Sequence, residues 1–261
     1  YLNFSAVGLI TSATTKQWDE ETQAEYTVTT GGADIIKGGA DADVLLGGAE
    51  GDTIYGGHGR NVVFGDFGAA TFQVDDGVNR VKTATTSDSD VGAYVDEANP
   101  GFVDTIKTFE PGQDTDFEAG DRDVVLGGAA GDVIELSDGD DVVLGDFGSL
   151  EFSGVYLSKA TTRENGGADL VTEGGADEIS GAGGLDVVLG GAAGDEILLG
   201  AGQDVVLGDF GVAEFSETTG IINWVTTYDE FLDLEETQTA GGVDTITGSE
   251  GRDIVLGGGA G

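Results

Sequence analysis

The chain has 261 residues, of which 48 are glycine and none is cysteine, and its 50 acidic against 10 basic residues give a formal net charge of −40 at pH 7. This charge repels nucleic acid and anionic membranes and attracts cations, so we expect no nucleic-acid partner. No apolar run approaches the roughly 20 residues of a membrane-spanning helix, and we expect no membrane insertion. A secreted chain without disulfides needs another kind of cross-link to stabilise its fold, and bound metal ions are the usual one.

The chain opens with strand signals at Phe4 and at "SATT" (12–15), and then a nine-residue repeat begins. In its first block four polar residues stand nine positions apart, each followed by a short apolar run: Asp34, Asp43, Asp52 and Asn61. Glycine-rich stretches precede them. We expect the apolar runs to form short strands and the Gly-Asp stretches to form turns.

Three later blocks repeat this pattern. The second has Asp114, Asp123, Asp132 and Asp141, the third has Asp177, Asp186, Asp195 and Asp204, and the fourth begins with Asp244 and Asp253. An off-period aspartate precedes the second and third blocks, Asp104 in "GFVDTIK" and Asp169 in "GGADLVT". Such a fixed period indicates a solenoid of stacked units.

These units of glycine-rich turn, aspartate and β-branched strand resemble the RTX calcium-binding repeat, G-G-x-G-x-D-x-U-x. "GGHGRNVVF" (56–64) departs from the motif only at Asn61, whereas units such as "GGAAGDVIE" (127–135) move the later glycine by one place. In two further units an acid, Asp41 or Asp121, stands in the place of that glycine. The resemblance covers somewhat over half of the chain. It implies an all-β fold, a right-handed parallel β-roll or β-solenoid with calcium in its turns, interrupted by short β-strand insertions.

In a parallel β-roll two nine-residue units make one turn, so aspartates 18 residues apart stack in neighbouring turns. The central residue of each strand points into a core one side chain deep, and glycines bring backbone carbonyls close together. Carbonyls and two aspartates then form an oxygen cage that suits several Ca²⁺ ions rather than zinc or magnesium. The expected partners are Asp34 with Asp52, Asp43 with Asn61, Asp114 with Asp132, Asp123 with Asp141, Asp177 with Asp195, and Asp186 with Asp204.

An alternative is that these aspartates only form turns. Turn formation accounts for the residue types but not for the strict phasing, and stacked carboxylates repel one another without a cation. We therefore regard all the aspartates named above as candidate calcium ligands, the off-period Asp104 and Asp169 included. The neutral oxygen of Asn61 should give the weakest site.

Each complete block ends in "GDFG", at Asp66, Asp146 and Asp209. We interpret this motif as the end of a calcium block, in which the aspartate completes the last cage and Phe67, Phe147 or Phe210 plugs the core. A plain turn with an exposed phenylalanine is the alternative. Another aromatic residue lies six positions after each aspartate, followed by "TATT", "KATT" or "WVTT". These segments predict ordinary strands, and the polar stretches after them predict loops.

The blocks divide the chain into four superrepeats, and we interpret the chain as a window on a longer tandem array. The expected boundaries are 1–68 with a calcium block at 31–68, 69–148 with a block at 101–148, 149–211 with a block at 166–211, and an incomplete 212–261 with a block from 241.

We expect no enzyme, because the single histidine, His58, lies in a turn and no catalytic motif is present. The favoured function is a calcium-rigidified structural region of a large secreted or cell-surface protein, such as an adhesin, surface-layer or fibre-forming protein, with self-association into filaments as a possibility. The alternative is a carrier or secretion module of an exported RTX enzyme or toxin. The only support for a glycan partner is a set of four aromatic residues that could form a sugar-binding platform, although such residues more often cover the end of a core: Tyr94, Trp224, Tyr228 and Phe231.

Overall fold

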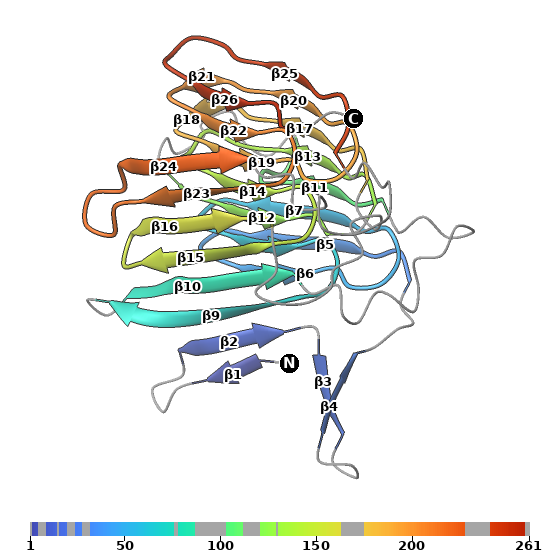
Figure 1. Ribbon diagram of the computed structural model, residues 1–261. Helices are drawn as coiled ribbons and strands as arrows, with labels where there is room; N and C mark the ends of the chain where they lie inside the picture. The colour runs from blue at the N-terminus through green and yellow to red at the C-terminus, as the bar shows by residue number, and fades with distance from the viewer. Residues whose placement is uncertain are drawn as a thin grey trace.

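The computed structural model describes residues 2–4, 9–14, 16–19, 24–27, 32–75, 78–86, 103–111, 121–128, 130–162, 175–227 and 241–258. These residues form strands and turns but no helix, so the described part of the chain offers no helical membrane span. Three sheets stack as layers and run the length of the molecule, from blue strands at the bottom of Figure 1 to red strands at the top. The all-β expectation is confirmed.

Two of the three sheets are parallel and have seven strands each, which confirms the β-roll. The outer parallel sheet contains β5 (Ile35–Gly39), β7 (Thr53–Gly57), β11 (Thr105–Lys107), β13 (Val133–Glu135), β17 (Glu178–Ser180), β20 (Glu196–Leu198) and β25 (Thr245–Thr247). The middle sheet contains β6 (Val44–Leu46), β8 (Val62–Phe64), β12 (Val124–Leu126), β14 (Val142–Leu144), β19 (Val187–Leu189), β22 (Val205–Leu207) and β26 (Ile254–Leu256). The chain alternates between them, and the central residues of successive strands stand nine positions apart except between β11 and β12 and across the hairpins of the third sheet.

The central side chains of these strands form the core between the two parallel sheets. Ile54, Ile106 and Ile134 of the outer sheet meet Val63 and Val125 of the middle sheet, and all five are fully buried. Equivalent residues stand in register from strand to strand, as Ile106 does with Ile54 and Ile134. The expected inward direction of the central residue is confirmed.

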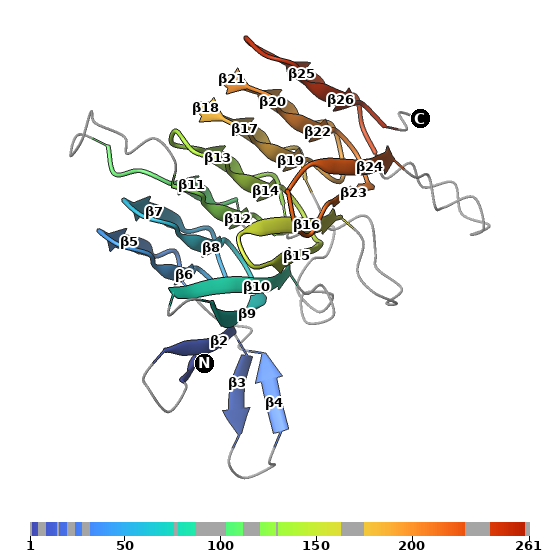
Figure 2. The same cartoon turned by 90° about the vertical axis from the view of Figure 1, so that its left-hand side faces the viewer.

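The segments between the calcium blocks build the third layer, an eight-stranded antiparallel sheet. Its strands are β1 (Leu2–Phe4), β2 (Ile10–Thr14), β9 (Gly68–Asp75), β10 (Val78–Thr86), β15 (Ser149–Ser153), β16 (Tyr156–Thr161), β23 (Gly211–Phe215) and β24 (Ile222–Thr227). The strands themselves were predicted from the sequence, but their pairing into one continuous sheet was not. Successive hairpins pair with each other, as β10 does with β15 and β16 with β23. Figure 2 shows this sheet beside the parallel stack.

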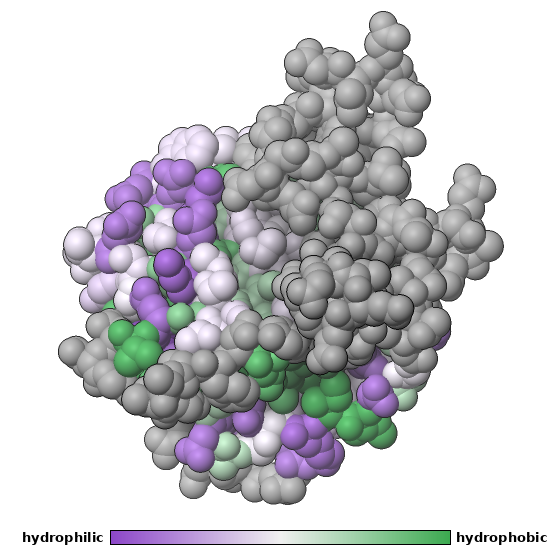
Figure 3. All heavy atoms as spheres, turned by 90° about the horizontal axis from the view of Figure 1, so that it is seen from below, coloured by the Kyte–Doolittle hydropathy of each residue, from purple (hydrophilic) through white to green (hydrophobic). Residues whose placement is uncertain are grey.

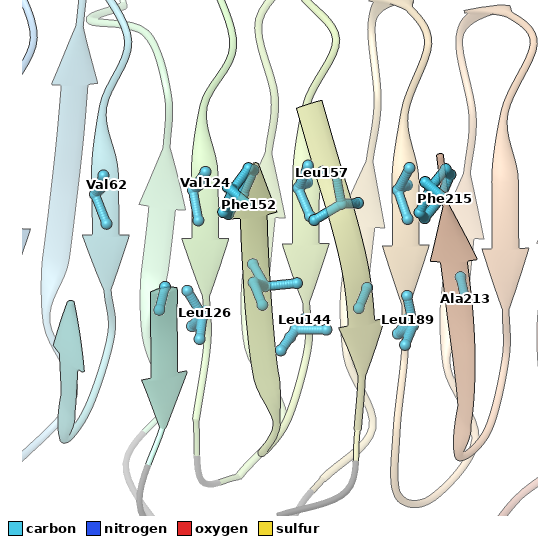
Figure 4. Packing of buried hydrophobic residues seen from close by; sticks show 14 of the residues in the cluster. Val62, Val124, Leu126, Leu144, Phe152, Leu157, Leu189, Ala213 and Phe215 are labelled. Carbon is cyan, nitrogen blue, oxygen red and sulfur yellow. The ribbon is translucent and has the colours of Figure 1, made fainter. Parts of the chain in front are cut away.

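A second core lies between the antiparallel sheet and the middle sheet. Leu126, Leu144 and Leu189 of the middle sheet pack with Phe152 and Phe215 of the antiparallel sheet (Figure 4). The middle sheet is therefore buried on both faces, and this second core is additional to the one expected between the parallel sheets. Apolar residues on both faces of the middle strands supply the second core.

The phenylalanines of the GDFG motifs do not plug either core. Phe67 lies outside both clusters and packs against Ala49 and Phe147 in a small cluster of its own, while Phe210 is half-buried. Two short pairs complete the described structure, β3 (Lys16–Asp19) with β4 (Ala24–Thr27), and β18 (Gly183–Gly184) with β21 (Ala201–Gly202). The superrepeat boundaries stay a prediction.

Candidate calcium sites

Two ladders of polar residues run along the turns of the solenoid. Ladder I precedes the strands of the outer parallel sheet and consists of Asp34, Asp52, Asp104, Asp132, Asp177, Asp195 and Asp244. Ladder II precedes the strands of the middle sheet and consists of Asp43, Asn61, Asp123, Asp141, Asp186, Asp204 and Asp253. In both, the backbone N–H of one rung donates to the Oδ1 atom of the next.

This hydrogen bond fixes one oxygen of each carboxylate and leaves the other free to face the turn. In ladder I the N–H of Asp177 lies 2.9 Å from Oδ1 of Asp195, and the N–H of Asp104 lies 2.8 Å from Oδ1 of Asp132. The second oxygens of five buried ladder I rungs accept no hydrogen bond: Asp52, Asp104, Asp132, Asp177 and Asp195. Buried charged oxygens without partners are costly, which indicates that each awaits a positive charge.

The glycine after each middle strand shapes the space in front of these oxygens. A Cβ atom at Gly190 would lie 2.1 Å from Oδ2 of Asp195 and 2.3 Å from the carbonyl oxygen of Gly208. The same arrangement recurs at six turns, with 2.0 to 2.4 Å to the carboxylate and 2.3 to 2.7 Å to the next carbonyl: Gly47, Gly65, Gly127, Gly145, Gly190 and Gly208. A side chain at any of these six glycines would overlap the two oxygens, so glycine allows a carboxylate oxygen and a backbone carbonyl oxygen to face the same space. We call this space a seat, and its hard oxygen atoms are of the kind that calcium prefers.

Burial also shifts the proton affinities of the ladder I carboxylates. It raises the pKa of Asp104 to about 7, that of Asp177 to about 8 and that of Asp195 to about 9, since the charged form loses its water. The carboxylate of Asp177 raises the pKa of Asp195 further. At neutral pH the stack is thus unfavourable for ionised carboxylates until a cation neutralises them.

The stacking agrees with the expected partners in five of six cases. The sixth pairing, Asp114 with Asp132, is not tested, because Asp114 lies outside the described residues; Asp132 accepts the N–H of the off-period Asp104. Asp104 takes this rung because the chain re-enters the outer sheet at β11, directly after it. Asp114 and Asp169 lie outside the described residues. Whether each rung ligates calcium stays a prediction.

The GDFG aspartates lie beside ladder I. Asp146 accepts hydrogen bonds through Oδ1 from the N–H of Gly175 at 3.1 Å and through Oδ2 from the N–H of Ala192, so it joins its own turn to the next one. Asp209 likewise accepts from the N–H of Gly242 at 3.0 Å. Burial and the nearby Asp177 raise the pKa of Asp146 well above its usual range. These aspartates link turns as well as adding negative charge.

No group of three or more acidic or histidine side chains converges within the described ranges. Each seat instead combines one carboxylate oxygen with backbone carbonyl oxygens, a hard oxygen set that suits calcium. The repeat pattern predicted the aspartates but not the role of the glycines that form the seats. Their signal is the glycine that follows every apolar triad of the middle strands, in "LGG" and "LGD" alike.

The sheets and the turns together define a calcium-binding β-solenoid. The family model of the RTX calcium-binding nonapeptide repeat (4 copies) matches residues 28–53, 38–72, 119–149, 171–206 and 238–260, just over half of the chain. The chain belongs to this family, whose repeats bind calcium. Searches of curated proteins and of solved structures gave no match.

Proposed function

We propose that this chain is a calcium-rigidified rod within a large secreted or cell-surface protein of the adhesin, surface-layer or fibre-forming kind. The observation that carries the proposal is the continuity of the sheets across the block boundaries. β8 pairs with β12, β14 with β19 and β22 with β26 in the middle sheet, and the outer sheet continues in the same way. The four blocks thus share continuous sheets and are not separate domains joined by linkers.

The test is the shape of the chain in solution. In calcium, small-angle X-ray scattering should give a stiff rod, and two copies joined in tandem should have about twice the maximum dimension. The same chain without metal should be expanded, because its net charge of −40 is then uncompensated. A tandem that bends freely between its copies in calcium would contradict the rod.

Self-association is part of this proposal. At one end of the stack β5 and β6 each have one neighbour in their sheets, and at the other end so do β25 and β26. Apolar residues show between polar ones when the molecule is viewed from below (Figure 3), and Ile35 in β5 is 74% exposed. Open strand edges pair readily with further strands, either of the same chain or of another copy. Light scattering in calcium distinguishes filaments from monomers.

The runner-up function is a carrier module of an exported enzyme or toxin, and the buried carboxylates favour it. A chain that needs a cation at each turn stays unfolded where calcium is scarce and folds after export. The full gene separates the two: many further superrepeats favour the rod, and a single catalytic domain before the repeats favours the carrier. In both cases we propose an extracellular location and no catalytic activity of this chain.

A further inference from the structure

The longest hairpin of the antiparallel sheet extends beyond the strands on which it packs. β9 and β10 have eight and nine residues, whereas the strands of the hairpins β15–β16 and β23–β24 have five and six. The strands of the middle sheet have only three residues each. Residues at the start of β10, among them Val78 and Val81, line a cavity together with the turns that precede β6, β8 and β12.

This cavity has a volume of about 540 Å³ and lies between two hairpins of the antiparallel sheet and the middle sheet. It continues the second core, because Phe72 and Val81 pack on that core and yet stay only partly buried. Further apolar side chains of its walls are Ile10, Phe152 and Tyr156. Small-molecule sites have volumes of about 300–1,000 Å³, mostly apolar walls and a few polar groups. The size and the lining of the cavity therefore suit a small ligand.

The polar part of the lining is rich in arginine. Three of the ten basic residues of the chain line this cavity: Arg60, Arg80 and Arg122. Arg60 and Arg122 directly precede neighbouring rungs of ladder II, since the N–H of Asn61 donates to Oδ1 of Asp123 at 2.8 Å. Neighbouring strands of a sheet lie about 4.8 Å apart, so the two arginines start from adjacent turns. In a chain with a net charge of −40, this gathering of positive charge favours an anionic ligand.

Arg122 connects the turns of ladder II to the tip of the β15–β16 hairpin. Its Nε donates to the carbonyl of Asp140 at 2.9 Å, and its Nη1 donates to the carbonyl of Val155 at 2.6 Å. Burial lowers the pKa of Arg122, Asp140 and Asp141 raise it, and the positive charge of Arg60 lowers it. The two guanidinium groups are thus close enough to repel each other, and an anion between them would relieve this repulsion.

Three aspartates also line the cavity, but protein groups already engage them. Oδ2 of Asp121 accepts the N–H of Gly59 at 3.1 Å. Oδ1 of Asp140 accepts a backbone N–H at 3.0 Å, and its Oδ2 lies 3.9 Å from Nη2 of Arg122. Asp43 is a rung of ladder II and one of the candidate calcium ligands. These carboxylates therefore leave positive charge of the lining available to a ligand.

Arg60 supplies this charge, because it is exposed and forms no ion pair with any residue that the structure describes. We infer that the cavity binds a small amphipathic carboxylic acid, with its apolar body against Phe72, Val81 and Phe152 and its carboxylate at Arg60. A guanidinium group binds a carboxylate through two parallel hydrogen bonds, and apolar walls beside it exclude water. The site adds ligand binding to the proposed rod and uses none of its calcium sites.

Octanoate is the probe that tests this site, and 1-octanol and acetate separate its two parts. We expect isothermal titration calorimetry of the whole chain in calcium to show one octanoate site. 1-Octanol and acetate should each bind at least about tenfold more weakly, because each lacks one of the two contacts. Equal affinities for octanoate and 1-octanol would overturn the inference. So would the absence of octanoate binding by a chain with its full β signal in circular dichroism.

Arg60→Gln and Arg252→Gln form a matched pair for the same titration. Both arginines are exposed and directly precede a rung of ladder II, Asn61 or Asp253, but Arg252 does not line the cavity. We expect Arg60→Gln to weaken octanoate binding about tenfold, through the loss of charge-assisted hydrogen bonds, and to leave 1-octanol binding unchanged. Arg252→Gln should change neither. Equal octanoate affinities of the two variants would show that Arg60 does not hold the carboxylate and would overturn the assignment.

Discussion

The two parallel sheets are built from alternate units of one repeat, yet they meet different surroundings. The triads of the outer sheet have polar or exposed flanks, as in Thr53-Ile54-Tyr55 and Glu178-Ile179-Ser180, and in these two only the central residue is fully buried. The triads of the five inner strands of the middle sheet, such as Val142-Val143-Leu144, are buried at all three positions. Outward-facing residues of the outer sheet meet water, whereas those of the middle sheet meet the antiparallel sheet.

This difference shows that one repeat can serve two layers. The nine-residue period accounts for the solenoid, while the polarity of the flanking positions decides whether a further sheet covers a face. The comparison predicts that the middle sheet depends on apolar contacts and that calcium holds the turns shared by both sheets.

Removal of calcium should have the largest effect, since it acts on both sheets at once. Each ion bound at 100 times its Kd adds about 2.7 kcal/mol to the free energy of unfolding, so several together exceed the stability of an ordinary domain. We expect the β signal in circular dichroism to collapse in excess chelator and to return with calcium near 10⁻⁴ to 10⁻³ M, the affinity range of extracellular modules. A β signal that persists in chelator would show that the apolar layers suffice.

Two leucines at the same place in consecutive units compare the sheets directly. Leu207 in the middle sheet is fully buried, and Leu198 in the outer sheet is 52% exposed. In calcium, Leu207→Ala should lower the free energy of unfolding by about 2–5 kcal/mol, and Leu198→Ala by less than about 1 kcal/mol. Denaturant titration measures both. Similar losses would mean that the antiparallel sheet adds little to the burial of Leu207.

The pH dependence should have opposite signs with and without metal. In the metal-free chain burial raises the pKa of Asp195 and Asp141 to about 9 and that of Asp104 to about 7, against 3.8 for an ordinary aspartate. The folded state then holds protons that the unfolded state has released, so metal-free stability is greatest below about pH 4 and falls as pH rises through 7 to 9.

Calcium reverses this trend because it binds the deprotonated carboxylates. As the pH is lowered from 9 to 5, metal-free samples should gain β signal. At a fixed subsaturating calcium concentration, the melting temperature should fall as the pH is lowered over the same range. Equal slopes in the two series would contradict the role of the buried carboxylates. Melting curves by circular dichroism at pH 5, 7 and 9 provide the measurement.

The smallest effect should come from the water-facing side of the outer sheet. The Nζ atom of Lys107 lies 2.6 Å from Glu135 Oε1, and both side chains are partly exposed. Ion pairs of this kind contribute about 0–1 kcal/mol. Lys107→Met should therefore shift the melting temperature by no more than a few degrees, less than Leu207→Ala does. A larger shift would indicate that the exposed face also stabilises the solenoid.

The period of the aspartates predicted the parallel sheets and the ladder contacts within a block, such as Asp177 with Asp195, because both follow from local spacing. The contacts that cross an insertion, such as Asp132 with Asp177, were not predicted. Asp104 was named as a candidate without a partner, since a long insertion separates it from Asp52 and only the sheet shows where the chain returns. The third layer could have been predicted from the sequence, because the Val-Val-Leu triads are apolar on both faces of the strand. Contacts such as that of the Ser137 hydroxyl with Asp123 depend on the fold, and spacing alone does not reveal them.

The rungs of ladder I keep their register although the chain between them varies greatly in length. Neighbouring rungs are separated by 18 residues at Asp34 and Asp52, by 52 at Asp52 and Asp104, and by 45 at Asp132 and Asp177. Two of these three intervals contain a hairpin of the antiparallel sheet, whose strands also pair with those of the next hairpin. The hairpin tips can therefore be lengthened, exchanged or replaced by foreign peptides at little thermodynamic cost. Such a scaffold would display inserted sequences at regular heights.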